Sequence, residues 1–178
     1  MQQTDADLLA KARQFDKGAL AWIFDQYSPA VNRYAWRMLG SLQLAEDCTS
    51  DIFLRFLDAL HAGKGPKDNL KAYLFRSAHN WVVDHYRSKA AEETTLPEES
   101  RDSESSVETN VETTMRIKET LHALETLKKE QREVVLLKYV EGMDNQEIAR
   151  VIHKPVGAVK ALLHRAVNNL RKEFNYEA

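Results

Sequence analysis

The stretch from Asp144 to Arg171 constrains the fold most, because it combines a helix start, a break and a second amphipathic helix. Asp144 and Glu147 have the spacing of a capping box, which begins a helix. Pro155 cannot continue that helix and biases Lys154 towards an extended backbone. Apolar residues at three-and-four spacing then predict a second helix. The pattern is a helix-turn-helix, whose second helix is of the kind that enters a DNA major groove. The buried face predicted for the second helix is Val159, Leu162, Leu163, Ala166, Val167 and Leu170.

The charge of this segment supports contact with DNA. The whole chain has a net charge of -2, so its positive character is local. A basic stripe along a helix is the electrostatic signature of phosphate contact. The alternative is an ordinary solvated helix hairpin whose basic residues serve solubility. The basic residues are Arg150, Lys154, Lys160, Arg165, Arg171 and Lys172, with no acidic residue between them.

Composition limits the class of protein. The 178 residues allow one ordinary domain or two small ones, and 43% hydrophobic residues indicate a globular chain. The single cysteine, Cys48, excludes an intrachain disulfide, and its place on an apolar stripe favours a buried residue over a redox switch. No apolar run is long enough to span a bilayer, and the N-terminal sequence lacks the apolar core of a signal peptide. We therefore expect a cytoplasmic protein.

Residues 90–113 divide the chain. Acidic residues, serines and threonines dominate this segment, and Arg101 is its single basic residue. Such a composition buries too little apolar surface to offset the entropy of ordering, so it predicts a flexible acidic linker. The expected fold class is all-α, with two small helical domains over residues 1–89 and 114–178 and the helix-turn-helix in the second.

The first domain is predicted to be a series of helices with no strand. Ser28 and Pro29 are expected to kink or restart the second helix, and Gly40 to end it. Gly63, Gly65 and Pro66 predict a loop before a last helix. Helices are predicted over residues 5–15, 19–39, 44–60 and from Asn69, which caps the last one. The buried stripe predicted for this last helix is Leu70, Tyr73, Leu74, Ser77, Ala78, Trp81, Val82 and His85.

Three segments in this order resemble a known family. They are AEDCTSDIFLRFLDAL, NLKAYLFRSAHNWVVDHYRSK and LKKEQREVVLLKYVEGMDNQEIARVIHKPVGAVKALLHRAVNNLR. They are similar to the core-binding, -10-binding and -35-binding segments of extracytoplasmic-function sigma factors of the sigma-70 family. The resemblance implies promoter recognition without catalysis by this chain. It also implies three kinds of partner: core RNA polymerase (the clamp helices of the largest subunit and the flap region), promoter DNA and an anti-sigma factor.

An acidic stripe on the third predicted helix is a candidate docking surface. Asp47, Asp51, Leu54 and Asp58 follow one another at spacings of four, three and four, so they share an outward face. Carboxylates around an exposed leucine suit a basic helical surface. The resemblance implies that this surface is the clamp-helix region, and Arg55 is assigned to the same interface. The alternative is an ordinary solvated helix face.

The fourth predicted helix and the loop before it are the candidate -10 site. Phe75 falls off the predicted buried stripe, and an exposed aromatic ring can stack on a splayed base at ~1–3 kcal/mol. The spacing of Trp81 favours the core over a role as a melting wedge. The loop 61–69 is similar in position to the family loop that captures a flipped base, although the sequence does not single out His61, Lys64, Lys67 or Asp68 for that contact. The polar and charged candidates for the helix are Lys71, Arg76, His79, Asn80, Asp84 and Arg87.

The second helix of the helix-turn-helix is the candidate -35 site. Lys160 and Arg165 can donate to phosphates or to guanine. Ala158, Ala161 and Leu162 stand where the family often has a threonine, a serine and an arginine, so readout is expected to depend on methyl contacts and DNA shape. The predicted contact set is Lys154, Gly157, Ala158, Lys160, Ala161, His164 and Arg165.

Two other functions compete with this prediction. A stand-alone helix-turn-helix regulator would share the second domain but normally binds symmetric half-sites as a dimer. A helical hydrolase would need Asp84 and His85 to act together, yet adjacent residues on a helix point in different directions. His153 and His164 lack a cysteine or acidic partner, so no metal site or cofactor is predicted.

Overall fold

The computed structural model describes residues 5–92 and 122–174, and all regular structure in these ranges is helical. The chain divides into two compact units, residues 1–102 and 103–178. The all-α prediction is therefore confirmed. The predicted linker, 90–113, lies outside the described residues except for 90–92, which continue the last helix of the first unit. Alanine and glutamate are strong helix formers, which explains this extension.

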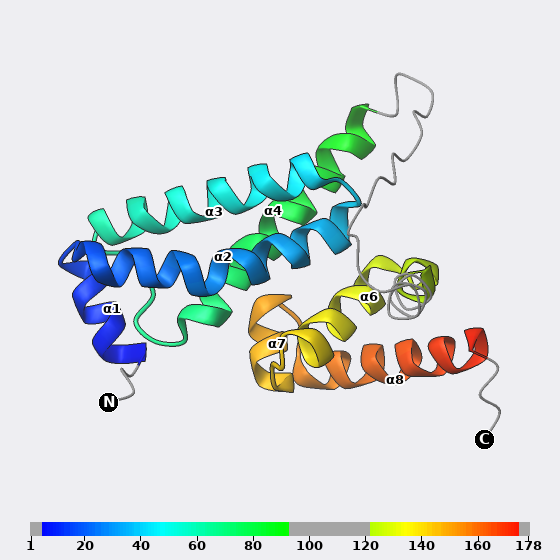
Figure 1. The fold of residues 1–178 in the computed structure, drawn as a ribbon. Coiled ribbons are helices and arrows are strands. Elements are labelled where there is room, and N and C mark those ends of the chain that lie inside the picture. Colours follow the sequence, from blue (N-terminus) through cyan, green and yellow to red (C-terminus); the bar gives the residue numbers. More distant parts are fainter. Residues whose placement is uncertain (1–4, 93–121, 175–178) are drawn as a thin grey trace, which may run out of the picture. The chain divides into compact units, whose positions relative to one another are not determined.

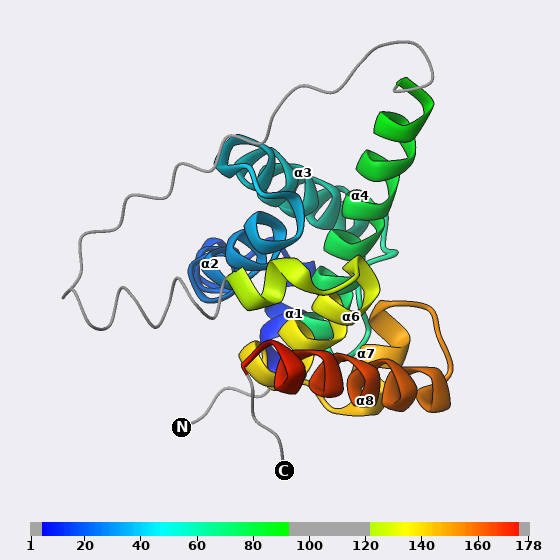
Figure 2. The same ribbon diagram turned by 90° about the vertical axis from the view of Figure 1, so that its right-hand side faces the viewer.

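The first unit consists of α1 (Asp5–Arg13), α2 (Lys17–Leu39), α3 (Leu42–His61) and α4 (Leu70–Glu92). Helices α2 and α3 form a hairpin, and α4 packs against both of them (Figures 1 and 2). Gly40 ends α2 as predicted, with a left-handed φ of 70° and its N–H bonded to the carbonyl of Trp36. Ser41 then caps α3, because its hydroxyl accepts from the N–H of Leu44 at 3.3 Å.

Pro29 does not interrupt α2, which continues from Lys17 to Leu39 as one helix. Of the two predicted alternatives, a kink or a restart, the restart is therefore wrong. Buried residues on both sides of the proline, including Ile23 and Val31, hold the two halves on the same core. Burial of apolar side chains offsets the hydrogen bond that the proline cannot donate.

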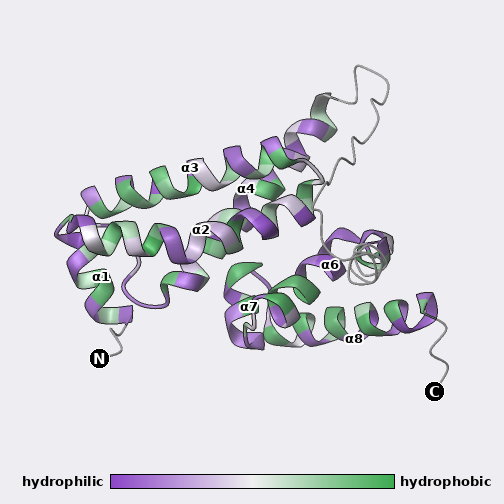
Figure 3. Ribbon diagram, in the orientation of Figure 1, coloured by the Kyte–Doolittle hydropathy of each residue, from purple (hydrophilic) through white to green (hydrophobic). Residues whose placement is uncertain are grey.

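The core of the first unit is formed by the facing stripes of α2, α3 and α4. Hydrophobic and hydrophilic residues alternate along the ribbon of α3 in Figure 3, as an amphipathic helix requires. Tyr34 and Phe75 meet edge to face with ring centroids 5.5 Å apart. The hydroxyl of Tyr86 donates to the carbonyl of Met38, which ties α4 to the end of α2. The buried residues of α3 are Ala45, Cys48, Thr49, Ile52, Phe53, Phe56 and Leu60, and Leu57 is half-buried.

The second unit contains α6 (Lys129–Val135), the π-helix η1 (Leu136–Val140), α7 (Asn145–Val151) and α8 (Val156–Glu173). Residues 122–126 are also helical, and the side chain of Arg132 donates to the carbonyls of Leu124 and Glu125 at their end. Helix α8 packs against α6 and α7. An amide pair reinforces this packing, since Asn169 Nδ2 donates to Gln131 Oε1 at 3.0 Å.

Within residues 5–92 and 122–174, no helix combines the length and the apolar character that crossing a membrane requires.

Candidate functional site

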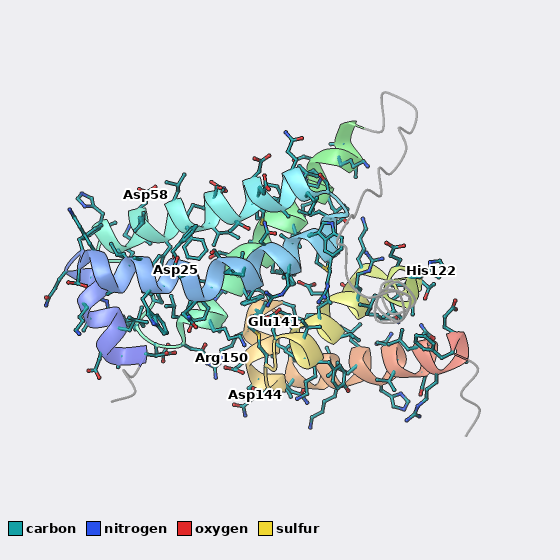
Figure 4. All side chains as sticks on the ribbon, in the orientation of Figure 1. Asp25, Asp58, His122, Glu141, Asp144 and Arg150 are labelled. Carbon is teal, nitrogen blue, oxygen red and sulfur yellow. The ribbon has the colours of Figure 1, made fainter. Side chains whose placement is uncertain are left out.

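The start of the helix-turn-helix has the geometry that the sequence predicts. Asp144 Oδ1 accepts from the N–H groups of Gln146 and Glu147 at 2.8 Å each. Glu147 Oε2 in turn accepts from the N–H of Asp144 at 2.9 Å. Both halves of the capping box are therefore present, and they satisfy amides that the helix itself leaves unpaired. Figure 4 labels Asp144 at this end of α7.

The turn between α7 and α8 reverses at His153, whose φ of 55° is left-handed. The N–H of Lys154 bonds to the carbonyl of Ala149 at 3.1 Å, which is the longer of the two hydrogen bonds of a Schellman ending. Pro155 then precedes the first residue of α8. The sequence predicted the break from Pro155 alone. It did not predict the left-handed residue, because that position is usually glycine.

Helix α8 separates a buried face from an exposed one. Val159, Leu162, Leu163 and Ala166 are buried, whereas Val167 and Leu170 of the predicted stripe are only half-buried. On the other face, Gly157, Lys160, Ala161, His164 and Arg165 are exposed, and Ala158 is half-buried. The residues predicted for the -35 site therefore lie together along one side of α8, with Lys154 in the turn before it.

Local bonds restrain several of these side chains. Arg165 Nε donates to the carbonyl of Ala161 at 3.2 Å, which leaves its two terminal nitrogens for a further partner. Asn168 Nδ2 lies 3.4 Å from His164 Nδ1. When this amide donates, the ring accepts at Nδ1 and carries its proton at Nε2. In that tautomer His164 presents a single N–H donor away from Asn168.

Lys154 already has an acidic partner. Its Nζ lies 3.1 Å from Glu130 Oε1 of α6, and both side chains are partly exposed. Sequence reasoning did not identify this pair, because the two residues are far apart in the chain. The contact joins the turn of the helix-turn-helix to α6 and places a carboxylate where a phosphate would approach Lys154.

The acidic stripe of α3 is exposed to solvent as expected. Asp47 and Asp58 are exposed, Asp51 is half-buried, and the side chain of Leu54 is 61% exposed. Figure 4 labels Asp58 on the side of α3 away from α2. Arg55 Nη2 lies 2.8 Å from Asp51 Oδ2, so one carboxylate of the stripe is partly neutralised within the helix.

The prediction that Phe75 is an exposed aromatic residue is wrong. Its side chain is 0% exposed and packs on Tyr34 of α2. The buried face of α4 is centred on Leu74, Phe75 and Ala78. Relative to the predicted stripe, this face is turned about the helix axis by one residue position. Tyr73 and Trp81 are correspondingly half-buried rather than enclosed. Phe75 therefore cannot stack on a base while this core is intact.

The other candidates of α4 are more accessible. Arg76, Asn80, Asp84 and Arg87 are exposed, and Lys71 and His79 are half-buried. Arg87 Nη1 lies 3.9 Å from Asp84 Oδ1, a loose pair between exposed side chains. Trp81 and His85 stack with ring centroids 5.7 Å apart and planes 4° from parallel, so His85 does not face Asp84 as a catalytic pair would require.

The loop between α3 and α4 is folded back on its neighbours. Asn69 caps α4 as predicted, since its Oδ1 accepts from the N–H of Ala72 at 2.9 Å. Pro66 is buried, and its carbonyl accepts from Arg13 Nη2 at 2.6 Å. Lys64, Lys67 and Asp68 remain exposed, and so does His61 at the end of α3.

Cys48 is buried in the first unit, as its position on the apolar stripe of α3 indicates. Burial raises the pKa of its thiol from 9.0 to about 12, and the nearby carboxylate of Asp51 adds to the effect, whereas Arg55 opposes it. Across residues 5–92 and 122–174, no three His, Cys, Asp or Glu side chains come together in a way that would hold a metal ion.

Sequence reasoning missed several exposed large hydrophobic residues. Trp22 and Phe24 of α2 are about half exposed, and the Phe24 ring meets Phe53 of α3 edge to face at 4.9 Å. Tyr139 and Val140 are exposed at the end of η1, where the N–H of Glu141 bonds to the carbonyl of Leu136. The π-helix could not be predicted from the spacing of apolar residues, because its hydrogen bonds are only one residue longer than those of an α-helix.

Comparison with known proteins agrees with this arrangement. Family models match twice: Sigma-70 region 2 over residues 23–92, which includes α3 and α4, and Sigma-70, region 4 over residues 117–170, which includes the helix-turn-helix. The ECF RNA polymerase sigma factor BldN of Streptomyces coelicolor is 33% identical over 169 residues, which cover 93% of this chain and 64% of BldN. This chain thus spans just under two thirds of the length of BldN.

Two further comparisons cover most of the chain. The ECF RNA polymerase sigma factor SigW of Bacillus subtilis is 25% identical over 190 residues, covering 93% of this chain and 94% of SigW. A solved structure of the sigma factor RpoE with the anti-sigma factor NepR from Bartonella quintana has a TM-score of 0.74 and 20% identity, covering 89% of this chain and 98% of that one. The chain belongs to the extracytoplasmic-function (ECF) group of the sigma-70 family.

Proposed function

We propose that this chain binds core RNA polymerase, directs it to promoters through -35 and -10 contacts, and assists DNA opening. The observation that carries the proposal is the exposed face of α8, where Lys160, His164 and Arg165 lie together on the second helix of the helix-turn-helix. Such a face fits a major groove, and its cations complement phosphate. The polymerase supplies the chemistry, and this chain supplies binding.

The two units have different roles in this proposal. Residues 1–89 bind the polymerase core and the -10 element, residues 90–113 link them to the second domain, and residues 114–178 bind the -35 element. On α3 the docking surface is Asp47, Asp51, Leu54, Arg55 and Asp58. On α4 the DNA contacts are Lys71, Arg76, His79, Asn80, Asp84 and Arg87. On the turn and α8 they are Lys154, Gly157, Ala158, Lys160, Ala161, His164 and Arg165.

Small residues shape the proposed -35 readout. Gly157 and Ala161 are exposed and carry no hydrogen-bonding side chain. They allow α8 to approach the groove closely, and the alanine can contact a thymine methyl group. Only a few donors remain for base edges, so sequence preference depends partly on DNA shape.

An anti-sigma factor is the remaining proposed partner. RpoE of Bartonella quintana has been solved with such a protein, and its fold is shared by this chain. A protein that works with RNA polymerase on promoters would act in the bacterial cytoplasm.

In-vitro transcription with purified core polymerase tests the proposal. We expect the chain to form a holoenzyme that initiates at discrete sites on genomic DNA fragments, whereas core polymerase alone does not. Asp47→Lys combined with Asp51→Lys should abolish holoenzyme formation, because it reverses the charge of the docking stripe. Asp25→Lys, which changes an exposed acid of α2 outside that stripe, is the matched control.

Failure of the wild-type chain to form a holoenzyme would refute the proposal. DNase footprinting separates it from a stand-alone regulator: tight protection of a symmetric operator without polymerase would favour the regulator.

A further inference from the structure

The loop between α3 and α4, residues 62–69, is fixed at both ends by helix capping. At the α3 end, the N–H of Ala62 bonds to the carbonyl of Asp58 at 2.9 Å, and the N–H of Lys64 bonds to that of Ala59 at 2.8 Å. Gly63 provides the left-handed residue between them, with φ of 67°. At the other end Asn69 caps α4.

The middle of the loop is held by a different part of the chain. Arg13, the last residue of α1, donates from Nη2 to the carbonyl of Pro66 at 2.6 Å. Next to the loop, the rings of Phe15 and His61, the last residue of α3, meet edge to face with centroids 5.9 Å apart and planes at 77°. The backbone of Phe15 is left-handed, with φ of 56°, a conformation that a bulky residue adopts only when its surroundings require it.

The loop backbone also lies close against α3. A Cβ added at Gly65 would come within 2.7 Å of Leu60 Cδ2, and the neighbouring Pro66 is buried. Lys64, Lys67 and Asp68 are exposed on this supported backbone. The arrangement is therefore a fixed frame that presents three charged side chains.

We propose that Arg13 and Phe15, in the turn between α1 and α2, are positioning residues that hold the 62–69 loop in the shape needed to capture a flipped -10 base. This inference rests on the proposed promoter function. Extruding a base costs a few kcal/mol, which contacts in the receiving pocket must offset. A loop that is already ordered loses no further conformational entropy when the base arrives. The binding free energy of its contacts with the base is therefore not reduced by a cost of ordering the loop.

Two measurements on full-length Arg13→Ala test the proposal. In the first, limited trypsin digestion of the free protein should cut faster after Lys64 and Lys67, because the Pro66 carbonyl no longer has its donor. In the second, the holoenzyme is assayed on a promoter whose -10 bases are replaced one at a time by abasic sites. An abasic site at the captured position slows open-complex formation, and this effect should be about three- to tenfold smaller in the variant, the range expected for one ordinary hydrogen bond.

Matched variants separate positioning from a general loss of charge or stability. Arg13→Lys keeps a donor and should recover part of the discrimination. Lys11→Ala removes an exposed cation from the same helix and should match wild type in both measurements. Phe15→Leu removes the edge contact to His61 and should act in the same direction as Arg13→Ala.

The outcomes distinguish the two levels of the proposal. A wild-type holoenzyme that is indifferent to every abasic site would refute base capture, and this inference with it. A wild-type holoenzyme with a sensitive position, together with unchanged discrimination in Arg13→Ala, would overturn the positioning role alone.

Discussion

Glu130 is the residue whose position most affects the proposed -35 contact. Its carboxylate lies 3.1 Å from Lys154 Nζ, in the turn where DNA phosphate would approach. A phosphate that approaches Lys154 must therefore compete with this carboxylate for the same ammonium group. Because both groups are partly exposed, the pair itself contributes little to stability, about 0–1 kcal/mol.

Glu130→Gln should strengthen promoter binding by the holoenzyme up to about fivefold at low salt, since it frees Lys154 and removes a repelling charge. Titration of a fluorescent -35 fragment at several salt concentrations measures this. Glu125→Gln, another exposed acid of the second unit, is the control. Equal affinities for Glu130→Gln and wild type would show that Lys154 makes no phosphate contact.

Cys48 is predicted to be chemically inert in the folded protein. With its pKa raised from 9.0 to about 12, its thiolate fraction at pH 8 is about a thousandfold smaller than that of a free thiol. Iodoacetamide labelling followed by mass spectrometry should proceed only when urea unfolds the first unit. Fast labelling of native protein would contradict the burial of this residue.

The same pKa shift makes the folding stability of the first unit depend on pH. The folded state holds the neutral thiol, so this contribution is complete below pH 9 and is lost as the pH rises from there towards 12. Cys48→Ala lacks this dependence and should lose less stability than wild type between pH 8 and 10.

Among the elements, α7 depends most on its first residues, because it spans only Asn145–Val151 and cannot be stable by itself. Asp144→Ala removes the side-chain oxygen that accepts from Gln146 and Glu147 and should destabilise α7 by about 1 kcal/mol, although the backbone N–H of residue 144 can still donate to Glu147. Hydrogen exchange of its amides should accelerate about fivefold. Asp144→Asn keeps a capping oxygen and should stay close to wild type. Identical exchange in both variants would argue against the cap.

For α8, the exposed cations should determine the salt dependence of DNA binding. Lys160→Ala and Arg165→Ala should each weaken promoter binding and lower the log–log salt slope by about 0.9 for every phosphate that the variant no longer neutralises. Lys172→Ala, in the last turn of the same helix, tests whether position matters beyond charge. An unchanged slope for Lys160→Ala would show that this residue does not touch a phosphate.

On the scale of the whole molecule, each unit has its own buried core. All three tryptophans, Trp22, Trp36 and Trp81, lie in the first unit, so tryptophan fluorescence reports on that unit alone. Ile148→Ala, in the core of the second unit, should cost about 2–5 kcal/mol there. We expect it to shift part of the urea transition seen by circular dichroism and to leave the fluorescence midpoint unchanged. Parallel shifts would indicate one cooperative unit.

The sequence by itself determined three of the helix ends. Gly40, Asn69 and the Asp144–Glu147 capping box all act at the predicted positions. These signals depend on hydrogen bonds between residues only a few positions apart, so no tertiary contact is needed to read them. The buried stripes of α3 and most of α8 were also predictable, because each helix has one strongly apolar face.

The tertiary structure alone decided which face of α4 is buried and which cations are engaged. The sequence does not show which face of α4 is buried, because aromatic residues occur around much of the helix. In the structure, contact with Tyr34 buries Phe75. The pairs Lys154–Glu130 and Arg13–Pro66 join residues distant in the chain. The physical reason is that local spacing specifies where a helix begins and which side is apolar, whereas partners are chosen only when separate helices pack together.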